Sequence, residues 1–162
     1  MQGMATSEEH DKLVAMCARW FKRNGFSVVA TELASHGNRE QPDVYACRQT
    51  CSAVAEIKVN RADFLADRKK PERHRGGLGT YRFYLCPEGL ISPSELPTGW
   101  GLLYASGKTI LSIHAPKGNL WPAPGKQDEH WRQFAHEIDP DAERAALFSI
   151  ARRLAAGKPT HK

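Results

Sequence analysis

The stretch that decides the fold is residues 42–59, PDVYACRQTCSAVAEIKV. Two apolar runs flank the turn-forming residues 48–52, and this pattern predicts a β-hairpin. Side chains alternate between the two faces of a strand, so Glu56 and Lys58 point the same way while Ile57 points the other way. The opposite face of the hairpin is then apolar and comprises Val44, Ala46, Ala53, Ala55, Ile57 and Val59.

The pairing register of this hairpin determines whether Asp43 joins the polar face. If Asp43 pairs with Glu56, which needs a two- or four-residue loop, its carboxylate meets Glu56 and Lys58 on one face. A three-residue loop would place Asp43 opposite Ala55 instead. A slip of one residue separates the two acids, so the functional hypothesis requires the first register.

Two carboxylates and an ammonium group on one face of a sheet are typical of a divalent-cation site. Mg²⁺ and Mn²⁺ bind carboxylate oxygens together with several waters. A neighbouring lysine can orient or deprotonate a metal-activated water, or offset the charge that builds on a phosphate. Asp43, Glu56 and Lys58 are therefore the candidate catalytic residues.

Pro42-Asp43, followed after the hairpin by Glu56-Ile57-Lys58, resembles the signature of the PD-(D/E)xK nuclease superfamily, which has a restriction-endonuclease-like fold. The longer segments EIKVNRADFLADRKKP (56–71) and YRFYLCP (81–87) resemble the MmcB-like branch, whose members are assigned to DNA repair. The resemblance covers about residues 28–105. It implies that Asp43 and Glu56 bind the metal, that Lys58 assists catalysis and that the Ile57 carbonyl is a further ligand. The insertion at 73–79 and the long tail depart from that branch.

Residues 26–33 predict a strand before the hairpin, and Glu32 near its end is the choice for an extra metal ligand. Glu32 could lie beside Asp43 if the two strands are neighbours. A polar residue on a solvated strand explains Glu32 equally well.

Two helices are predicted around these strands. Thr6 with Glu9 forms a capping-box pattern, and the first helix should run from there to Asn24-Gly25. Asn60 should cap the second helix, which Pro71 ends. Leu13, Cys17, Trp20 and Phe21 are expected in the core, whereas Asp63 and Asp67 are expected to serve as a cap residue and a surface charge.

The positive charge of the chain is concentrated behind the hairpin. Residues 58–82 hold eight Lys and Arg against three Asp and Glu, an excess of five positive charges. This excess equals the net charge of +5 of all 162 residues. Cations beside a metal-like site suit a polyanion such as nucleic acid. The resemblance to a DNA-repair branch implies DNA more than RNA. A solvated helix face with locally paired charges is the alternative. The predicted backbone contacts are Arg61, Arg68, Lys69, Lys70, Arg73 and Arg75.

The chain as a whole predicts an α/β protein with a mixed central sheet flanked by helices. The strands are expected near 26–33, 43–47, 53–59, 81–86 and 100–105, with a further strand at 109–113. We expect a nuclease-like core at 1–115, and a linker and helical extension at 116–162 packed on the same domain. The extension should form helices at 127–138 and 141–156, and its stripe of Ala145, Phe148, Ala151 and Leu154 should pack on its own domain or, alternatively, on a second copy or a protein partner.

Composition limits the class of protein. Apolar residues make up 41% and charged residues 25%, as in ordinary globular proteins. No membrane-span-length apolar run and no signal-peptide pattern is visible, and the four cysteines are scattered, so a cytoplasmic protein with free thiols is expected. The sequence thus predicts a Mg²⁺- or Mn²⁺-dependent nuclease, in DNA repair or mobile-element biology. The alternatives are a non-catalytic nucleic-acid-binding module and a protein-interaction module on the same fold.

Overall fold

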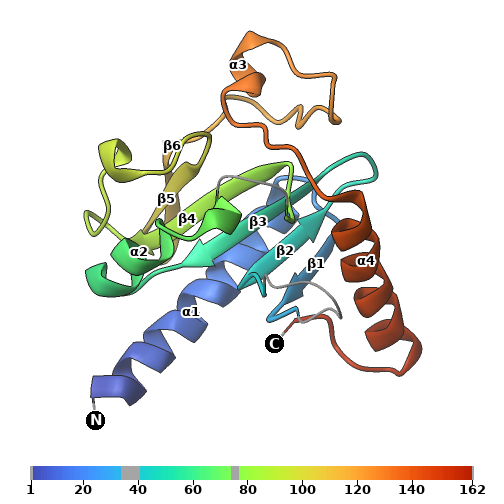
Figure 1. Ribbon diagram of the computed structural model, residues 1–162. Coiled ribbons are helices and arrows are strands. Elements are labelled where there is room, and N and C mark those ends of the chain that lie inside the picture. Colours follow the sequence, from blue (N-terminus) through green and yellow to red (C-terminus); the bar gives the residue numbers. More distant parts are fainter. Residues whose placement is uncertain (1, 34–40, 74–76, 162) are drawn as a thin grey trace.

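A six-stranded mixed sheet forms the centre of the protein (Figure 1). The computed structural model describes residues 2–33, 41–73 and 77–161. The strands lie in sequence order, with β3–β4 and β4–β5 parallel and the other neighbours antiparallel. The predicted α/β class with a mixed sheet is confirmed. The strands are β1 (Val28–Thr31), β2 (Val44–Cys47), β3 (Ser52–Ile57), β4 (Tyr81–Pro87), β5 (Gly101–Ser106) and β6 (Thr109–His114).

The β2–β3 hairpin has the register that the functional hypothesis requires. Cys47 pairs with Ser52 and Val44 pairs with Ala55, so the loop has four residues, 48–51. Continuing this register by one residue places Asp43 opposite Glu56. The predicted apolar face is also confirmed, because its strand residues all belong to one buried cluster: Val44, Ala46, Ala53, Ala55 and Ile57.

Helix α1 (Gln2–Arg23) covers that apolar face of the sheet. Leu13, Cys17 and Phe21 are buried against it, as the helical spacing predicted. The helix ends as predicted, with Gly25 in the left-handed region at φ 84°. Its predicted start is wrong: Thr6 lies inside the helix and is not the N-cap. Gln2, Met4 and Ala5 are good helix formers, and the helix includes them despite Gly3 and the capping pattern at Thr6.

Helices α2 (Arg61–Asp67) and α4 (Pro140–Ala155) cover the opposite face (Figure 1). Phe64 of α2 packs over β4 and β5, and Ile150 of α4 packs over β1, β2 and β3. The predicted N-cap is confirmed, since the side chain of Asn60 accepts a hydrogen bond from the Asp63 N–H. A short 3₁₀ segment, η1 (Pro71–Arg73), follows α2 and returns the chain to the sheet. A second one, η2 (Pro93–Glu95), lies between β4 and β5.

The helix predicted at 127–138 is largely wrong. Only α3 (Glu129–Arg132) is helical, because the chain after it bonds to the start of β4 instead. Ala135 forms a bridge with Tyr81, and the His136 N–H donates to the Thr80 carbonyl. A backbone N–H that donates its hydrogen bond to a neighbouring strand cannot also donate within a helix.

Helix α4 is present, but the prediction that its stripe packs on its own domain is wrong, whereas packing on a second copy or a partner stays a prediction. Phe148 is 65% exposed and Leu154 is 59% exposed, whereas Ala146 and Ile150 face the core. The cause is Glu143, which is buried and accepts hydrogen bonds from Tyr45, Ser52 and the Gly79 N–H. Orienting Glu143 inward turns the predicted stripe outward. Among the described residues, no helix combines the length and the apolar character needed to cross a membrane.

Candidate functional site

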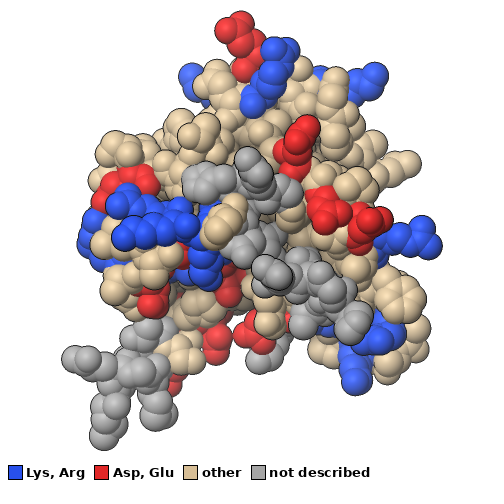
Figure 2. All heavy atoms as spheres, viewed as in Figure 1, with Lys and Arg blue, Asp and Glu red and all other residues tan. Residues whose placement is uncertain are grey.

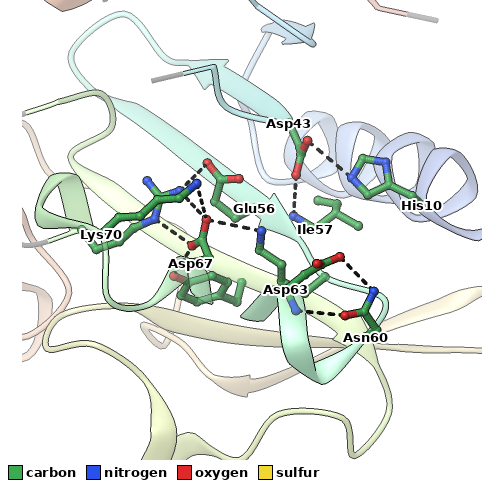
Figure 3. Close-up of polar contacts among 11 residues, drawn as sticks. His10, Asp43, Glu56, Ile57, Asn60, Asp63, Asp67 and Lys70 are labelled. Atoms are coloured by element: carbon green, nitrogen blue, oxygen red, sulfur yellow. Dashed lines mark hydrogen bonds and ion pairs between the residues drawn. The ribbon is translucent and has the colours of Figure 1, made fainter. Parts of the chain in front are cut away.

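A cavity of about 590 Å³ opens where β2, β3, α1, α2 and η1 meet. It collects Asp43, Glu56 and Lys58, the three predicted catalytic residues, together with Ile57. Figure 3 shows Asp43, Glu56 and Ile57 in this region. These side chains come from two strand ends and are brought together by the hairpin register. The other residues that line the cavity are His10, Gln41, Asp63, Asp67, Lys70, Pro71 and Arg73.

Asp43 is held at the end of β2 by two contacts. Its Oδ2 accepts a hydrogen bond of 2.8 Å from the Ile57 N–H, and its Oδ1 lies 3.4 Å from Nε2 of His10 on α1 (Figure 3). The hydrogen bond between His10 and Asp43 is the main reason that the pKa of His10 is raised, although burial lowers that pKa. The backbone bond to Ile57 fixes Asp43 relative to β3, so its carboxylate cannot drift from Glu56.

Glu56 lies within β3 and is only 8% exposed. Its Oε1 is 3.5 Å from Nη2 of Arg73. Burial raises the pKa of Glu56 to about 8, and the negative charges of Asp43 and Asp67 add to this, while Arg73 and Lys58 oppose it. The surroundings therefore hold too little positive charge for an ionised Glu56, and an added cation would stabilise it.

Lys58 follows β3, and its Nζ lies 3.3 Å from Oδ1 of Asp67. The prediction that Asp67 is a surface charge is wrong, because Asp67 is 2% exposed. It is the last residue of α2 and turns toward β4, where the Tyr84 hydroxyl donates to its Oδ2 at 2.6 Å. Burial works against the charge of Asp67, but hydrogen bonds from Arg73 and Tyr84 outweigh it and hold the pKa of Asp67 below its usual range.

The predicted backbone-contacting cations divide into two groups. Arg73 is internal: it is 5% exposed, donates two hydrogen bonds of 2.8 Å to Asp67 and stacks on Trp100. This placement favours a structural role over contact with a nucleic acid backbone. The other described cations, Arg61, Arg68, Lys69 and Lys70, lie on α2 or just after it, where Figure 2 shows Lys and Arg side chains gathered on the surface.

These outer cations are partly engaged. Arg61 pairs with Glu95 at 2.5 Å, and Arg68 donates to the Glu95 carbonyl. Lys70 is 3.4 Å from Oδ1 of Asp67 with its side chain 56% exposed, and Lys69 is exposed. Arg75 lies outside the described residues. The surface around α2 thus presents cations beside the cavity, although neighbouring groups offset part of the charge.

Glu32, the predicted extra ligand, is not brought into this cavity. Its backbone N–H donates to the Asp43 carbonyl, so β1 and β2 are neighbours as the hypothesis supposed. Glu32 lines a different pocket, with Arg153 and Lys158. It directly follows β1 and has a φ of 50°, in the left-handed region. Over residues 2–33, 41–73 and 77–161, no cluster of three or more His, Cys, Asp or Glu side chains forms a metal-binding group.

The donor set that remains fits Mg²⁺ or Mn²⁺. Asp43 and Glu56 line one open cavity, and the raised pKa of Glu56 indicates a local deficit of positive charge. Mg²⁺ in particular binds proteins through one or two carboxylates and keeps several waters, so two acids are sufficient. Ile57 lines the cavity, and its N–H is occupied by Asp43.

Sequence reasoning missed His10, and it misplaced Asp67. His10 lies three residues before Leu13 and seven before Cys17, so it shares the helical face that packs on the sheet. That spacing could have identified it. No local signal distinguishes Asp67 from an exposed helix residue, because its burial depends on Tyr84 and Arg73 arriving from elsewhere in the chain.

Comparisons with known proteins show the fold alone. No protein-family model matches the sequence, and no curated protein matches it. A solved structure of a protein of unknown function from Silicibacter pomeroyi, SPO1766, is similar with a TM-score of 0.58 and 22% identity. The similarity covers 89% of this chain and 85% of that one.

Proposed function

We propose that the protein is a metal-dependent nuclease that hydrolyses phosphodiester bonds in nucleic acid, with DNA as the preferred substrate. The observation that carries the proposal is the convergence of Asp43, Glu56 and Lys58 on one cavity, through a hairpin register that a one-residue slip would abolish. The preference for DNA rests on the resemblance to the MmcB-like branch of the PD-(D/E)xK superfamily.

Asp43 and Glu56 would hold Mg²⁺ or Mn²⁺ in this proposal. Such an ion, when bound, acidifies a water and neutralises charge on a phosphate. The chain contributes the rest. Asp43 is fixed by its bond to the Ile57 N–H, and the ammonium of Lys58 orients the attacking water or offsets the charge that develops on the phosphate.

The charge balance of the cavity supports a requirement for the ion. Four carboxylates and three Lys or Arg side chains line the cavity. With Glu56 protonated, as its pKa of about 8 implies at neutral pH, these charges cancel, and with Glu56 ionised the lining carries one net negative charge. In both states a divalent cation makes the cavity net positive, so nucleic acid binding there should depend on it.

The test is incubation of the purified protein with single- and double-stranded DNA and RNA, in Mn²⁺, Mg²⁺ or EDTA. We expect cleavage with a divalent ion, none in EDTA, and a loss of at least about 100-fold in Asp43→Ala and in Lys58→Ala. Glu32→Ala is the matched control, since Glu32 lines another pocket. Cleavage that persists unchanged in Asp43→Ala would refute the proposal.

A non-catalytic nucleic-acid-binding module is the second candidate, and the Arg73–Glu56 ion pair favours it. An internal cation beside Glu56 is what a site that no longer takes a metal would contain. This candidate predicts binding without cleavage under every divalent ion. It also predicts that Mn²⁺ does not raise the melting temperature of the protein, whereas a metal-binding site predicts a rise that Glu56→Gln reduces.

A further inference from the structure

Lys58 needs a fixed partner if its ammonium is to act at a defined point. A lysine side chain has a flexible four-carbon stem, and holding it in one geometry costs rotamer entropy. Here the side chain of Lys58 is only 14% exposed, and its Nζ lies 3.3 Å from Oδ1 of Asp67. Asp67 is thus the partner that the structure offers to this amine.

Asp67 is itself held rigidly. Arg73 donates to both of its oxygens at 2.8 Å, and the Tyr84 hydroxyl donates to Oδ2 at 2.6 Å. Arg73 in turn is fixed by Trp100, whose Nε1–H donates to the Arg73 carbonyl at 3.0 Å and whose ring lies under the guanidinium. The carboxylate is therefore anchored to α2, η1 and β4 at once.

The contact with Lys58 is not needed to satisfy Asp67. A buried carboxylate requires a counter-charge and hydrogen bonds, and Arg73 with Tyr84 supplies both. Lys58, by contrast, lies at the end of β3 and depends on a neighbour for its direction. The same Arg73 also lies 3.5 Å from Glu56, so one buried unit contacts both Glu56 and Lys58.

We propose that Asp67 is a positioning residue that holds the Lys58 ammonium in the cavity that Asp43 and Glu56 line. This inference rests on the proposed nuclease function for its catalytic meaning, but the placement of Lys58 can be tested without it. Asp67 touches neither the metal ligands nor the substrate in this scheme, and it acts through Lys58.

The first experiment is a double-mutant cycle on cleavage with Asp67→Asn, Lys58→Met and the combined variant. We expect Asp67→Asn to lower kcat about 100-fold, as misplacement of a catalytic group does, with little change in KM. In the Lys58→Met background the same change should have no further effect. Asp141→Asn is the control, because Asp141 is an exposed residue of α4 and does not line the cavity. Equal losses from Asp67→Asn in both backgrounds would overturn the proposal.

The second experiment reads the lysine directly by NMR of the Lys58 side chain, assigned by its absence in Lys58→Met. An immobilised lysine shows two resolved proton shifts at Cε, and a mobile one shows an averaged signal. We expect resolved signals in the unsubstituted protein and in Asp141→Asn, and averaged signals in Asp67→Asn. Unchanged Lys58 signals in Asp67→Asn would overturn the proposal, whether or not the protein cleaves nucleic acid.

These measurements distinguish a variant that fails to fold from a variant in which Lys58 is misplaced. If Asp67→Asn fails to fold, Asp67→Glu keeps the charge, displaces the carboxylate, and should reduce kcat and average the Lys58 signals in the same way. If the unsubstituted protein cleaves nothing, the proposed function fails, while the NMR result still supports or overturns the placement of Lys58 by Asp67.

Discussion

Replacing Glu56 by Gln should change the pH dependence of stability in a direction that the structure fixes. Gln resembles the protonated carboxyl, so Glu56→Gln removes the ionisation and keeps the shape. Burial raises the pKa of Glu56 to about 8 in the folded protein, against the ordinary value of 4.5 in the unfolded chain. Between these values the folded state binds more protons than the unfolded state, so stability falls as pH rises.

The magnitude follows from proton linkage. Each pH unit inside this window removes up to about 1.4 kcal/mol, because one pKa unit corresponds to that free energy. Between pH 5 and pH 7 the unsubstituted protein should therefore lose about 3 kcal/mol relative to Glu56→Gln. Ionisation of Asp67 changes stability in the opposite direction. Because the pKa of Asp67 is lowered in the folded protein, stability rises with pH at acid pH, and this rise is complete by about pH 5.

The assay is urea unfolding of both proteins in EDTA at half-unit steps from pH 5 to pH 8, with the difference in free energy of unfolding plotted against pH. His10 also titrates with a raised pKa, but it does so in both proteins, so the difference isolates Glu56. A difference that stays constant across this range would refute the argument from burial. Adding Mn²⁺ should stabilise the unsubstituted protein increasingly as pH rises, with a smaller effect on Glu56→Gln.

Four further substitutions test the packing of the site and of the sheet. Arg73→Met should lower the free energy of unfolding by about 3–5 kcal/mol in urea titrations, because it leaves two buried carboxylates without their shared cation. Ile150→Ala should cost about 2–4 kcal/mol, whereas Phe148→Ala should cost less than about 1 kcal/mol, since these side chains are 3% and 65% exposed. Gly101→Ala should lower the melting temperature, because an added Cβ would lie 2.5 Å from the Phe83 ring. Equal costs at positions 148 and 150, or an unchanged melting temperature at 101, would contradict the packing described.

The sheet could be predicted from the sequence where local patterns determine it. The hairpin is fixed by alternation and by a loop whose length allows few registers, so Val44 and the other core residues were found in advance. The strand positions followed from runs of β-branched and aromatic residues between turn signals. Helix limits were less certain, because the pattern at Thr6 and the periodicity at 127–138 describe local preference alone, and contacts elsewhere in the fold override it.

The site could be predicted only in part, for a related reason. Asp43, Glu56 and Lys58 belong to one hairpin, so the pairing register of that hairpin alone determines that they lie close together. His10 and Asp67 reach the same cavity through the packing of α1 and α2 on the sheet, which the hairpin does not determine. Charge patterns in sequence also cannot separate a solvated cation such as Lys69 from the buried Arg73, since both are basic residues near the end of one helix.

The acids of the cavity differ in a way that only the three-dimensional structure shows, and this difference supports the assignment of their roles. Asp67 receives three hydrogen bonds and the charge of Arg73, and its lowered pKa means that it stays ionised without help. Glu56 shares that arginine at 3.5 Å, and burial raises its pKa because Arg73 and Lys58 do not offset the loss of solvation. A divalent cation should therefore gain more by binding Glu56 than by binding Asp67. Glu56, whose charge is not fully offset, is the carboxylate opposite Asp43. Asp67, whose charge is offset by Arg73 and by hydrogen bonds, is the carboxylate that holds Lys58.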